Sequence, residues 1–269
     1  MFFVLFPIAV GFSTAIAAGS AGRKTVILAL CIVGLVVFMA LAVVMGMEGL
    51  VCVLMAMPLL LVALIMGALL GLACRNTIFT GLLEKERRLP VIAFPLVLLL
   101  VGDPIARQID MAPPMSAIST TITLPQDPID VFEALRSMDT LDGEQPWLLR
   151  IGLPTPYRCV LEAERVGAER KCLFPNGHIT AVVTAYEPGT ALRMKVVEYE
   201  LTGRHWFHFG DADYAFERKG SGTRVTRTSS YRSDLQPRWY WAPLEKLGIE
   251  QEHEFVLRSL KKNLERAGH

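Results

Sequence analysis

WFHFGDADYAFERKGSGTRVTRTSSYR, residues 206–232, contains two strand-like runs separated by a turn. Aromatic and β-branched residues alternate with polar ones at 206–218 and again at 223–232. A spacing of two is typical of half-buried β-strands. Residues 219–222 (KGSG) supply the glycines that a tight reversal of the chain needs. The stretch therefore predicts an antiparallel hairpin with one buried face.

Two more predicted hairpins precede it in the chain. The first pairs residues 157–164 with 169–174, and the second pairs residues 177–186 with 190–199. Short segments containing glycine join the strands of each pair, as hairpins require. A further alternating run, SAISTTITL at 116–124, precedes them. Together these patterns predict seven antiparallel strands.

One short and one long helix are predicted in the same part of the chain as these strands. Asp127-Pro128 suits the N-cap and first position of a short helix that runs to Arg136. Residues 243–265 carry apolar side chains mostly three or four positions apart, which predicts a long helix. An antiparallel sheet with one wet face must cover the other, and the long helix is the obvious cover. We therefore predict an α+β domain at 116–269, with a bent sheet wrapped around its C-terminal helix.

This order of elements resembles a known group of proteins. With the Glu-Pro-Gly turn at 187–189 and the Gly-Thr-Arg-Val opening of the last strand at 222–225, residues 116–266 resemble the START-related (SRPBCC) superfamily. This helix-grip group includes polyketide cyclases/dehydrases and lipid-transport domains. The resemblance implies a cavity between sheet and helix that binds a hydrophobic small molecule or lipid. It implies no shared catalytic residue, and a cyclase/dehydrase-type enzyme or a non-catalytic interaction or sensory module is the alternative.

Residues 1–102 differ from the rest in composition. The chain is 52% hydrophobic over 269 residues, and the apolar excess lies in this part, where Glu48, Glu84 and Glu86 are the acidic residues. A bilayer is crossed by about 20 mostly apolar residues. Three apolar runs near or above this length, and a shorter fourth, lie at 1–18, 26–46, 50–73 and 89–101. We therefore predict a membrane bundle of three or four spanning helices, followed by a linker at 103–115.

Basic residues in the short loops predict the orientation of this bundle. Arg23 and Lys24 follow the first run, Glu48 lies between the second and third, and four basic residues precede the fourth. Because Lys and Arg concentrate in cytoplasmic loops, the first and third loops are predicted to be cytoplasmic. The soluble domain is then extracytoplasmic if residues 89–101 span and cytoplasmic if they do not. The membrane part also resembles that of uncharacterised bacterial membrane proteins, which implies a multi-pass protein of the inner membrane. The side of the soluble domain depends on the fourth run, and we predict that this run spans and that the domain is extracytoplasmic.

Charge and motif content exclude several classes of partner. The formal net charge is +1 without a concentrated basic stripe, which argues against nucleic acid. His205 and Asp211 share one face of a strand while His208 points the other way, so the three do not converge on a metal. We predict no metal and no cofactor, and we assign no catalytic residue. The predicted partners are the membrane and a hydrophobic small molecule or lipid, and a protein partner is left unspecified.

Two cysteines suggest the first candidates for a ligand cavity. If the first hairpin closes at 164–167, Cys159 lies opposite Cys172, and Tyr157 lies opposite Phe174 on the same face. That face is predicted to point inward. In an oxidising compartment the cysteines would form a cross-strand disulfide. Two buried free thiols are the alternative.

The last two strands contribute the remaining candidates. Trp206, His208 and Tyr214 share a face of their strand that is predicted to point inward. A catalytic alternative would use His208 or His178 as a proton carrier. The face of the last strand that carries Val225 also carries three further candidates, Arg227, Ser229 and Tyr231.

Arg227 is unusual among the apolar neighbours of this face. An unpaired charge in a low-dielectric interior is costly, so a buried arginine needs a partner. A ligand carboxylate or phosphate could fill this role. The structural alternatives are an ion pair with Glu162 or Glu198, or an outward orientation of this face.

Overall fold

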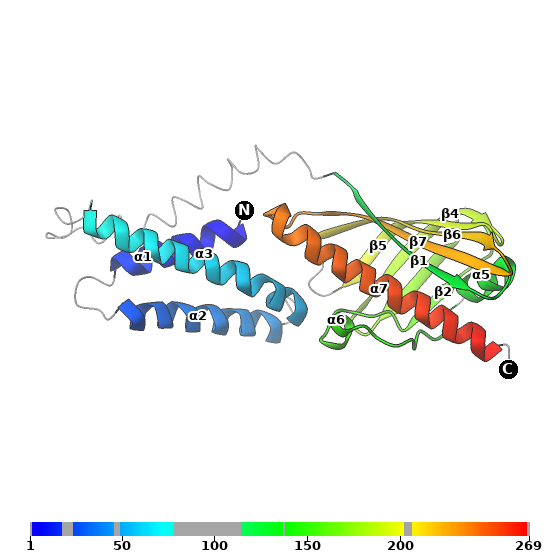
Figure 1. Cartoon of the computed structure of the whole chain (residues 1–269), viewed down its shortest axis with the longest axis horizontal. Helices are drawn as coiled ribbons and strands as arrows, with labels where there is room; N and C mark the ends of the chain where they lie inside the picture. Colours follow the sequence, from blue (N-terminus) through cyan, green and yellow to red (C-terminus); the bar gives the residue numbers. More distant parts are fainter. Residues whose placement is uncertain are drawn as a thin grey trace. The chain divides into compact units, whose positions relative to one another are not determined.

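The computed structural model describes residues 2–17, 24–45, 49–77, 114–136, 138–201 and 206–267 (Figure 1). The chain divides into two compact units. One comprises Met1–Glu48, Cys52–Ala112 and Leu235–Trp241, and the other comprises Gly49–Val51, Pro113–Asp234 and Ala242–His269.

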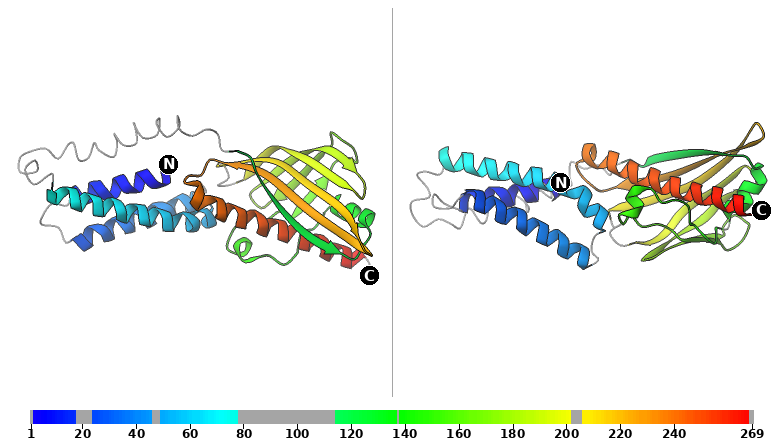
Figure 2. Two further views of the ribbon diagram at one scale, coloured as in Figure 1. Left: turned by 45° about the horizontal axis from the view of Figure 1, so that its top comes forward. Right: turned by 60° about the horizontal axis from the view of Figure 1, so that its bottom comes forward.

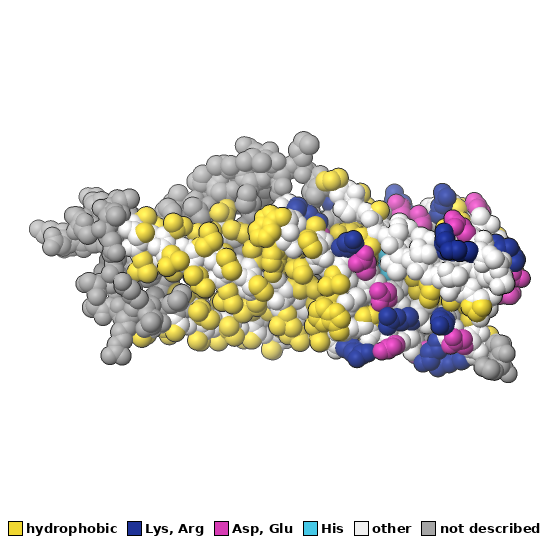
Figure 3. Space-filling model, in the orientation of Figure 1, with side chains coloured by type: hydrophobic (Ala, Val, Ile, Leu, Met, Phe, Trp, Pro, Cys, Tyr) yellow, Lys and Arg dark blue, Asp and Glu magenta, His cyan; other side chains and the backbone are white. Residues whose placement is uncertain are grey.

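The first unit contains three apolar helices, α1 (Phe2–Ala17), α2 (Lys24–Val44) and α3 (Leu50–Thr77). Within α3, Leu50–Cys74 is long and apolar enough to cross a membrane, whereas the apolar parts of α1 and α2 are shorter. Hydrophobic side chains dominate the face of these helices seen in Figure 3. The helices are present as predicted, and that they form a membrane bundle stays a prediction. The proposed fourth span, residues 89–101, lies outside the described residues.

Glycines allow close packing between α1 and α3. A Cβ added to Gly67 would collide with the backbone of Ile8, and one added to Gly71 would collide with the backbone of Phe12. Small residues spaced four apart let helices approach closely, and this is how apolar helices associate without a hydrophobic driving force.

The second unit is built on one antiparallel sheet. Its strands are β1 (Ser116–Leu124), β2 (Arg158–Leu161), β3 (Glu169–Phe174), β4 (Gly177–Glu187), β5 (Ala191–Leu201), β6 (Phe207–Lys219) and β7 (Gly222–Ser233). Their order in the sheet is β1-β7-β6-β5-β4-β3-β2. The seven predicted strands and three predicted hairpins are therefore confirmed. The first strand in sequence lies beside the last, so the two ends of the domain meet at one edge of the sheet.

The long helix α7 (Arg238–Ala267) runs along one face of this sheet (Figures 1 and 2). It begins before the predicted start at Pro243, because the N–H groups of Tyr240 and Trp241 donate to the carbonyl of Pro237 and close an earlier turn. The apolar side chains of its C-terminal half are buried: Phe255, Val256, Leu257, Leu260 and Leu264. This arrangement is the predicted helix-grip architecture.

The segment between α5 (Pro128–Arg136) and β2 contacts the side of α7 that does not face the sheet. The N–H of Leu148, in the short helix α6 (Trp147–Arg150), donates to Oε1 of Gln251 at 3.0 Å. Further along, the N–H of Gly143 donates to Oγ of Ser259 at 2.9 Å. Polar residues of α7 are therefore buried as well as apolar ones, because both the sheet and this segment cover the helix.

Candidate functional site

Alternate residues of β7 face α7, as predicted for the face that carries Val225. Val225 and Tyr231 are buried, and Arg227 and Ser229 lie between them on the same face. Arg227, Ser229 and Tyr231 each have a polar partner on the helix. The interior of the domain therefore contains a row of polar side chains from β7 between apolar neighbours.

Arg227 forms an ion pair with Glu252 of α7. Its Nη2 lies 2.8 Å from Oε2 and 3.0 Å from Oε1 of the carboxylate, and the two side chains are 11% and 20% exposed. Burial alone would lower the pKa of the guanidinium, but the charge of Glu252, the interaction with Tyr214 and the hydrogen bond to Glu252 together raise the pKa of Arg227 above its ordinary value. The predicted inward orientation is correct, whereas Glu162 and Glu198 are the wrong partners.

His253 lies next to this pair and is completely buried. Its Nε2 is 2.8 Å from Oγ of Ser229, and its Nδ1 is 3.1 Å from Oγ1 of Thr120 on β1. Burial, and then the charge of Arg227, lower the pKa of His253 to about 2. The ring is therefore neutral at physiological pH and connects β1, β7 and α7 through two hydroxyl groups.

This lowered pKa predicts a loss of stability in acid. The unfolded chain takes up a proton on His253 below pH 6.5, whereas the folded chain does so only near pH 2. Because the unfolded state then binds more protons, stability falls as the pH drops between these values, by about 1.4 kcal/mol per pH unit. Between pH 7 and pH 5 we expect His253 to account for a loss of about 2 kcal/mol in urea titrations.

His253→Gln keeps a hydrogen-bonding side chain and should remove this part of the pH dependence. The control is His208→Gln, which removes a partly exposed imidazole and leaves the buried one in place. An unchanged slope between pH 7 and pH 5 in His253→Gln would contradict the assignment.

Nearer the start of α7, Glu245 accepts two hydrogen bonds from β7. Oγ of Ser233 donates to Oε1 at 2.7 Å, and the hydroxyl of Tyr231 donates to Oε2 at 3.2 Å. Glu245 is buried. The polar row of β7 is thus matched along its length by polar residues of the helix, and Tyr231 contacts one of them rather than standing free in the interior.

A second buried arginine, Arg170, comes from β3. It is 4% exposed, and its Nη2 donates to the carbonyl of Leu135 at 3.1 Å. Its guanidinium carbon lies 5.8 Å from the ring centre of Tyr214, and that of Arg227 lies 5.6 Å from the same ring. Tyr214, which is buried as predicted, therefore neighbours two cations, both within the range of cation–π attraction.

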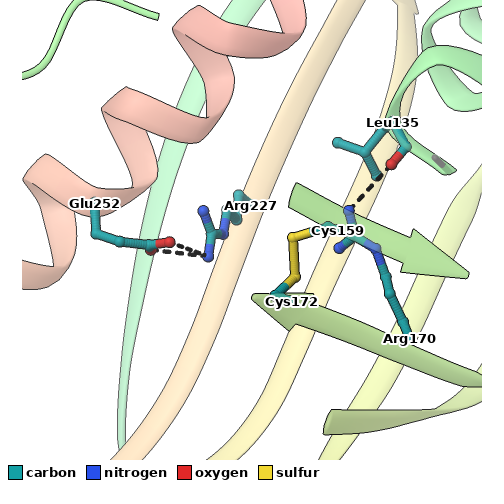
Figure 4. Close-up of a disulfide and its surroundings, with 6 residues drawn as sticks. All are labelled: Leu135, Cys159, Arg170, Cys172, Arg227 and Glu252. Atoms are coloured by element: carbon teal, nitrogen blue, oxygen red, sulfur yellow. Dashed lines mark hydrogen bonds and ion pairs between the residues drawn. A yellow bond between two sulfur atoms is a disulfide. The ribbon is translucent and has the colours of Figure 1, made fainter. Parts of the chain in front are cut away.

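The disulfide lies in the same region of the sheet (Figure 4). Cys159 on β2 pairs directly with Cys172 on β3, as the predicted register requires, and the two sulfur atoms are bonded at 1.97 Å. The disulfide is therefore the correct alternative, and the two free thiols are the wrong one. Phe174 is buried on the same face of β3.

Two other residues that were predicted to face the interior are not fully buried. Tyr157 is 50% exposed, because β2 begins only at Arg158 and strand alternation does not extend to it. Trp206 directly precedes β6 and is partly buried.

His208 faces away from α7, contrary to the prediction. An irregularity in the pairing of β6 with β7, between Phe209 and Ala212, adds one residue to β6 and reverses the alternation before it. His208 is paired with Arg232, on the outer face, and its Nε2 lies 2.8 Å from Asp234. It is therefore not the interior imidazole that the catalytic alternative requires.

The other histidine of that alternative, His178, lies 3.5 Å from Glu198 and 3.7 Å from Glu200, both of which are well exposed. Within the described part of the chain, no group of three His, Cys, Asp or Glu residues could hold a metal. His205, which was considered together with His208 and Asp211, lies outside the described residues.

Four interior residues were missed by the sequence interpretation. Arg170 shares the parity of Cys172 and Phe174 on β3, and this signal was available in the sequence. The others, Glu245, Glu252 and His253, lie on α7, where charged residues are more often solvated. Whether the interior residues contact a ligand stays a prediction.

The sheet, the long helix along its face and the polar groups between them define a helix-grip protein. The chain belongs to the family described as polyketide cyclase/dehydrase and lipid transport, whose model matches residues 115–265.

Solved structures of similar fold cover little more than half of the chain. The Aha1 dimer from Colwellia psychrerythraea is 15% identical with a TM-score of 0.35, covering 55% of this chain and 98% of its own. A protein from Nitrosomonas europaea is 14% identical with a TM-score of 0.41, covering 56% of this chain and 96% of its own. No curated protein matches the sequence.

Proposed function

We propose that this protein is a membrane-anchored helix-grip domain that binds a hydrophobic small molecule or lipid between its sheet and α7. The observation that carries the proposal is the row of polar side chains on β7 that meets α7 inside an otherwise apolar interior. A few fixed polar groups among apolar ones are what orients a ligand in such sites. Membership of a family that includes lipid transport proteins supports the same class of ligand.

The N-terminal helices support the anchoring. Leu50–Cys74 is of sufficient length and hydropathy for a span, and α1 and α2 add two further apolar helices. Anchoring keeps the domain at a high local concentration near ligands dissolved in the membrane. The bond between Cys159 and Cys172 supports an extracytoplasmic domain at the bacterial inner membrane, because disulfides persist in oxidising compartments.

The proposal predicts that a lipid or other apolar molecule co-purifies with the domain. The full chain would be purified in mild detergent, cleaved at a protease site engineered into residues 103–115, and analysed by native mass spectrometry with organic extraction. We expect a stoichiometric adduct on the fragment that contains the sheet. The cleavage separates this adduct from lipid that surrounds the helices.

The control is the same preparation without added protease, which reports total bound lipid. A fragment with the mass of the polypeptide alone, with all lipid retained by the helical portion, would contradict the binding proposal. That result would favour the alternative that the domain is a non-catalytic interaction or sensory module.

A further inference from the structure

The interior around Tyr214 has more positive than negative charge. Two buried cations, Arg170 and Arg227, lie 5.8 Å and 5.6 Å from its ring centre, and of these two Glu252 is paired with Arg227 alone. In the part of the chain that the structure describes, Arg170 has no carboxylate partner and only a carbonyl oxygen as acceptor. Figure 4 shows Arg227 directed toward Glu252 of α7 and Arg170 directed toward Leu135.

Both arginines also have unused donors. Arg227 contacts both oxygens of Glu252 through the single nitrogen Nη2, so its Nε and Nη1 are left without a hydrogen-bond partner among the described residues. Nε of Arg170 is likewise buried without a partner there. A buried donor left unpaired is costly, and more so when it belongs to a charged group. Three such donors lie on two guanidinium groups that both contact the ring of Tyr214, and an anion is the kind of group that would satisfy them.

From this arrangement we infer that the ligand is an amphiphile with an anionic head, a carboxylate or a phosphate, held by Arg170 and Arg227 beside Tyr214. The inference rests on the proposed function and names the ligand class of that site. Guanidinium groups suit both anions because their donors match the oxygens of carboxylates and phosphates. The bound head would supply the negative charge that the pair lacks, and its apolar chain would lie among the apolar residues between sheet and α7.

The test uses the full chain in amphipol and three probes that share one alkyl chain: dodecanoate, dodecyl phosphate and dodecanol. Equilibrium dialysis at neutral pH measures the affinity of each radiolabelled probe. We expect at least one anionic probe to bind about 10- to 100-fold more tightly than dodecanol, the range that charged hydrogen bonds contribute. The better of the two anions identifies a carboxylate or a phosphate head.

Arg170→Gln should weaken binding of the preferred anion about tenfold or more and leave dodecanol unchanged. Partition of each probe into amphipol is the same for every variant, so ratios between variants report the protein alone. The control is Arg218→Gln on β6, whose guanidinium is 60% exposed and pairs with Asp127, and it should bind all probes as the unchanged chain does. If Arg170→Gln does not fold, the comparison of the three probes on the unchanged chain decides.

The outcomes separate this inference from the proposed function. Equal binding of all three probes, unaffected by Arg170→Gln, would overturn the anionic head while the hydrophobic site stands. Binding of none would overturn the proposed function and the inference with it. Displacement of dodecyl phosphate by an equal concentration of inorganic phosphate would identify a site for free anions and overturn the amphiphile.

Discussion

Replacing Glu252 by leucine should lower the free energy of unfolding by about 3–5 kcal/mol, the cost of removing one partner of a buried ion pair. The variant leaves Arg227 charged and 11% exposed, with Nη2 joining Nε and Nη1 as unpaired donors. No other carboxylate lies within ion-pair distance of this guanidinium among the residues that the structure describes. The energy of desolvating the cation is then no longer compensated.

Urea titration of the full chain in mild detergent measures this change. Two of the four tryptophans, Trp147 and Trp206, belong to the unit that contains the sheet, so the change in tryptophan fluorescence includes the unfolding of that unit. The double variant Arg227→Leu/Glu252→Leu should recover most of the loss, because a buried ion pair can be replaced by apolar residues at little cost.

The matched control for Glu252→Leu is Glu254→Leu on the same helix. Glu254 is 45% exposed and pairs with Arg258 four residues on, a contact worth less than about 1 kcal/mol. Equal effects of the two substitutions would show that burial of the Arg227–Glu252 pair contributes nothing particular to stability.

The second large effect is expected from the disulfide. Breaking the bond between Cys159 and Cys172, which are 13 residues apart in sequence, should lower the free energy of unfolding by about 3 kcal/mol. The bond ties the edge strand β2 to β3 and restricts the unfolded chain. The same urea titration would compare the unchanged chain, with and without reductant, and the variant Cys159→Ser/Cys172→Ser.

Reductant should lower the midpoint of the unchanged chain and leave that of the double variant as it is. Three other cysteines, Cys31, Cys52 and Cys74, form no disulfide, so reductant should act on the midpoint only through the bond between Cys159 and Cys172. A midpoint that does not respond to reductant in the unchanged chain would contradict the predicted effect. Alkylation in intact cells would further test the compartment, because a cytoplasmic domain should present both thiols reduced.

Local sequence patterns were sufficient to predict the elements whose structure depends on neighbouring residues. The bounds of β1 and the start of α5 were predicted to the residue, because alternation and the Asp127-Pro128 start are local signals. The register that places Cys159 opposite Cys172 followed from one short turn. Short connections leave few alternative pairings, so the hairpins were predicted from the sequence alone.

The interior site depended on information that is not local. The reversed alternation in β6 moved His208 to the outer face, and the isolated Gly210 is the one local signal of the extra residue between Phe209 and Ala212. A single inserted residue exchanges the two faces of a strand, so an alternation argument fails for every position beyond it.

The amino-acid sequence determined the element order, the helix-grip fold and the register of the cysteines, because periodicity and turn chemistry act within a few residues. Only the tertiary structure decided that Arg227 meets Glu252, that His253 joins β1 to β7, and that Arg170 reaches the same tyrosine ring as Arg227. These contacts depend on how α7 is rotated about its axis and on which residues of distant strands share a row across the sheet. Both are set by packing of the whole domain rather than by any one segment.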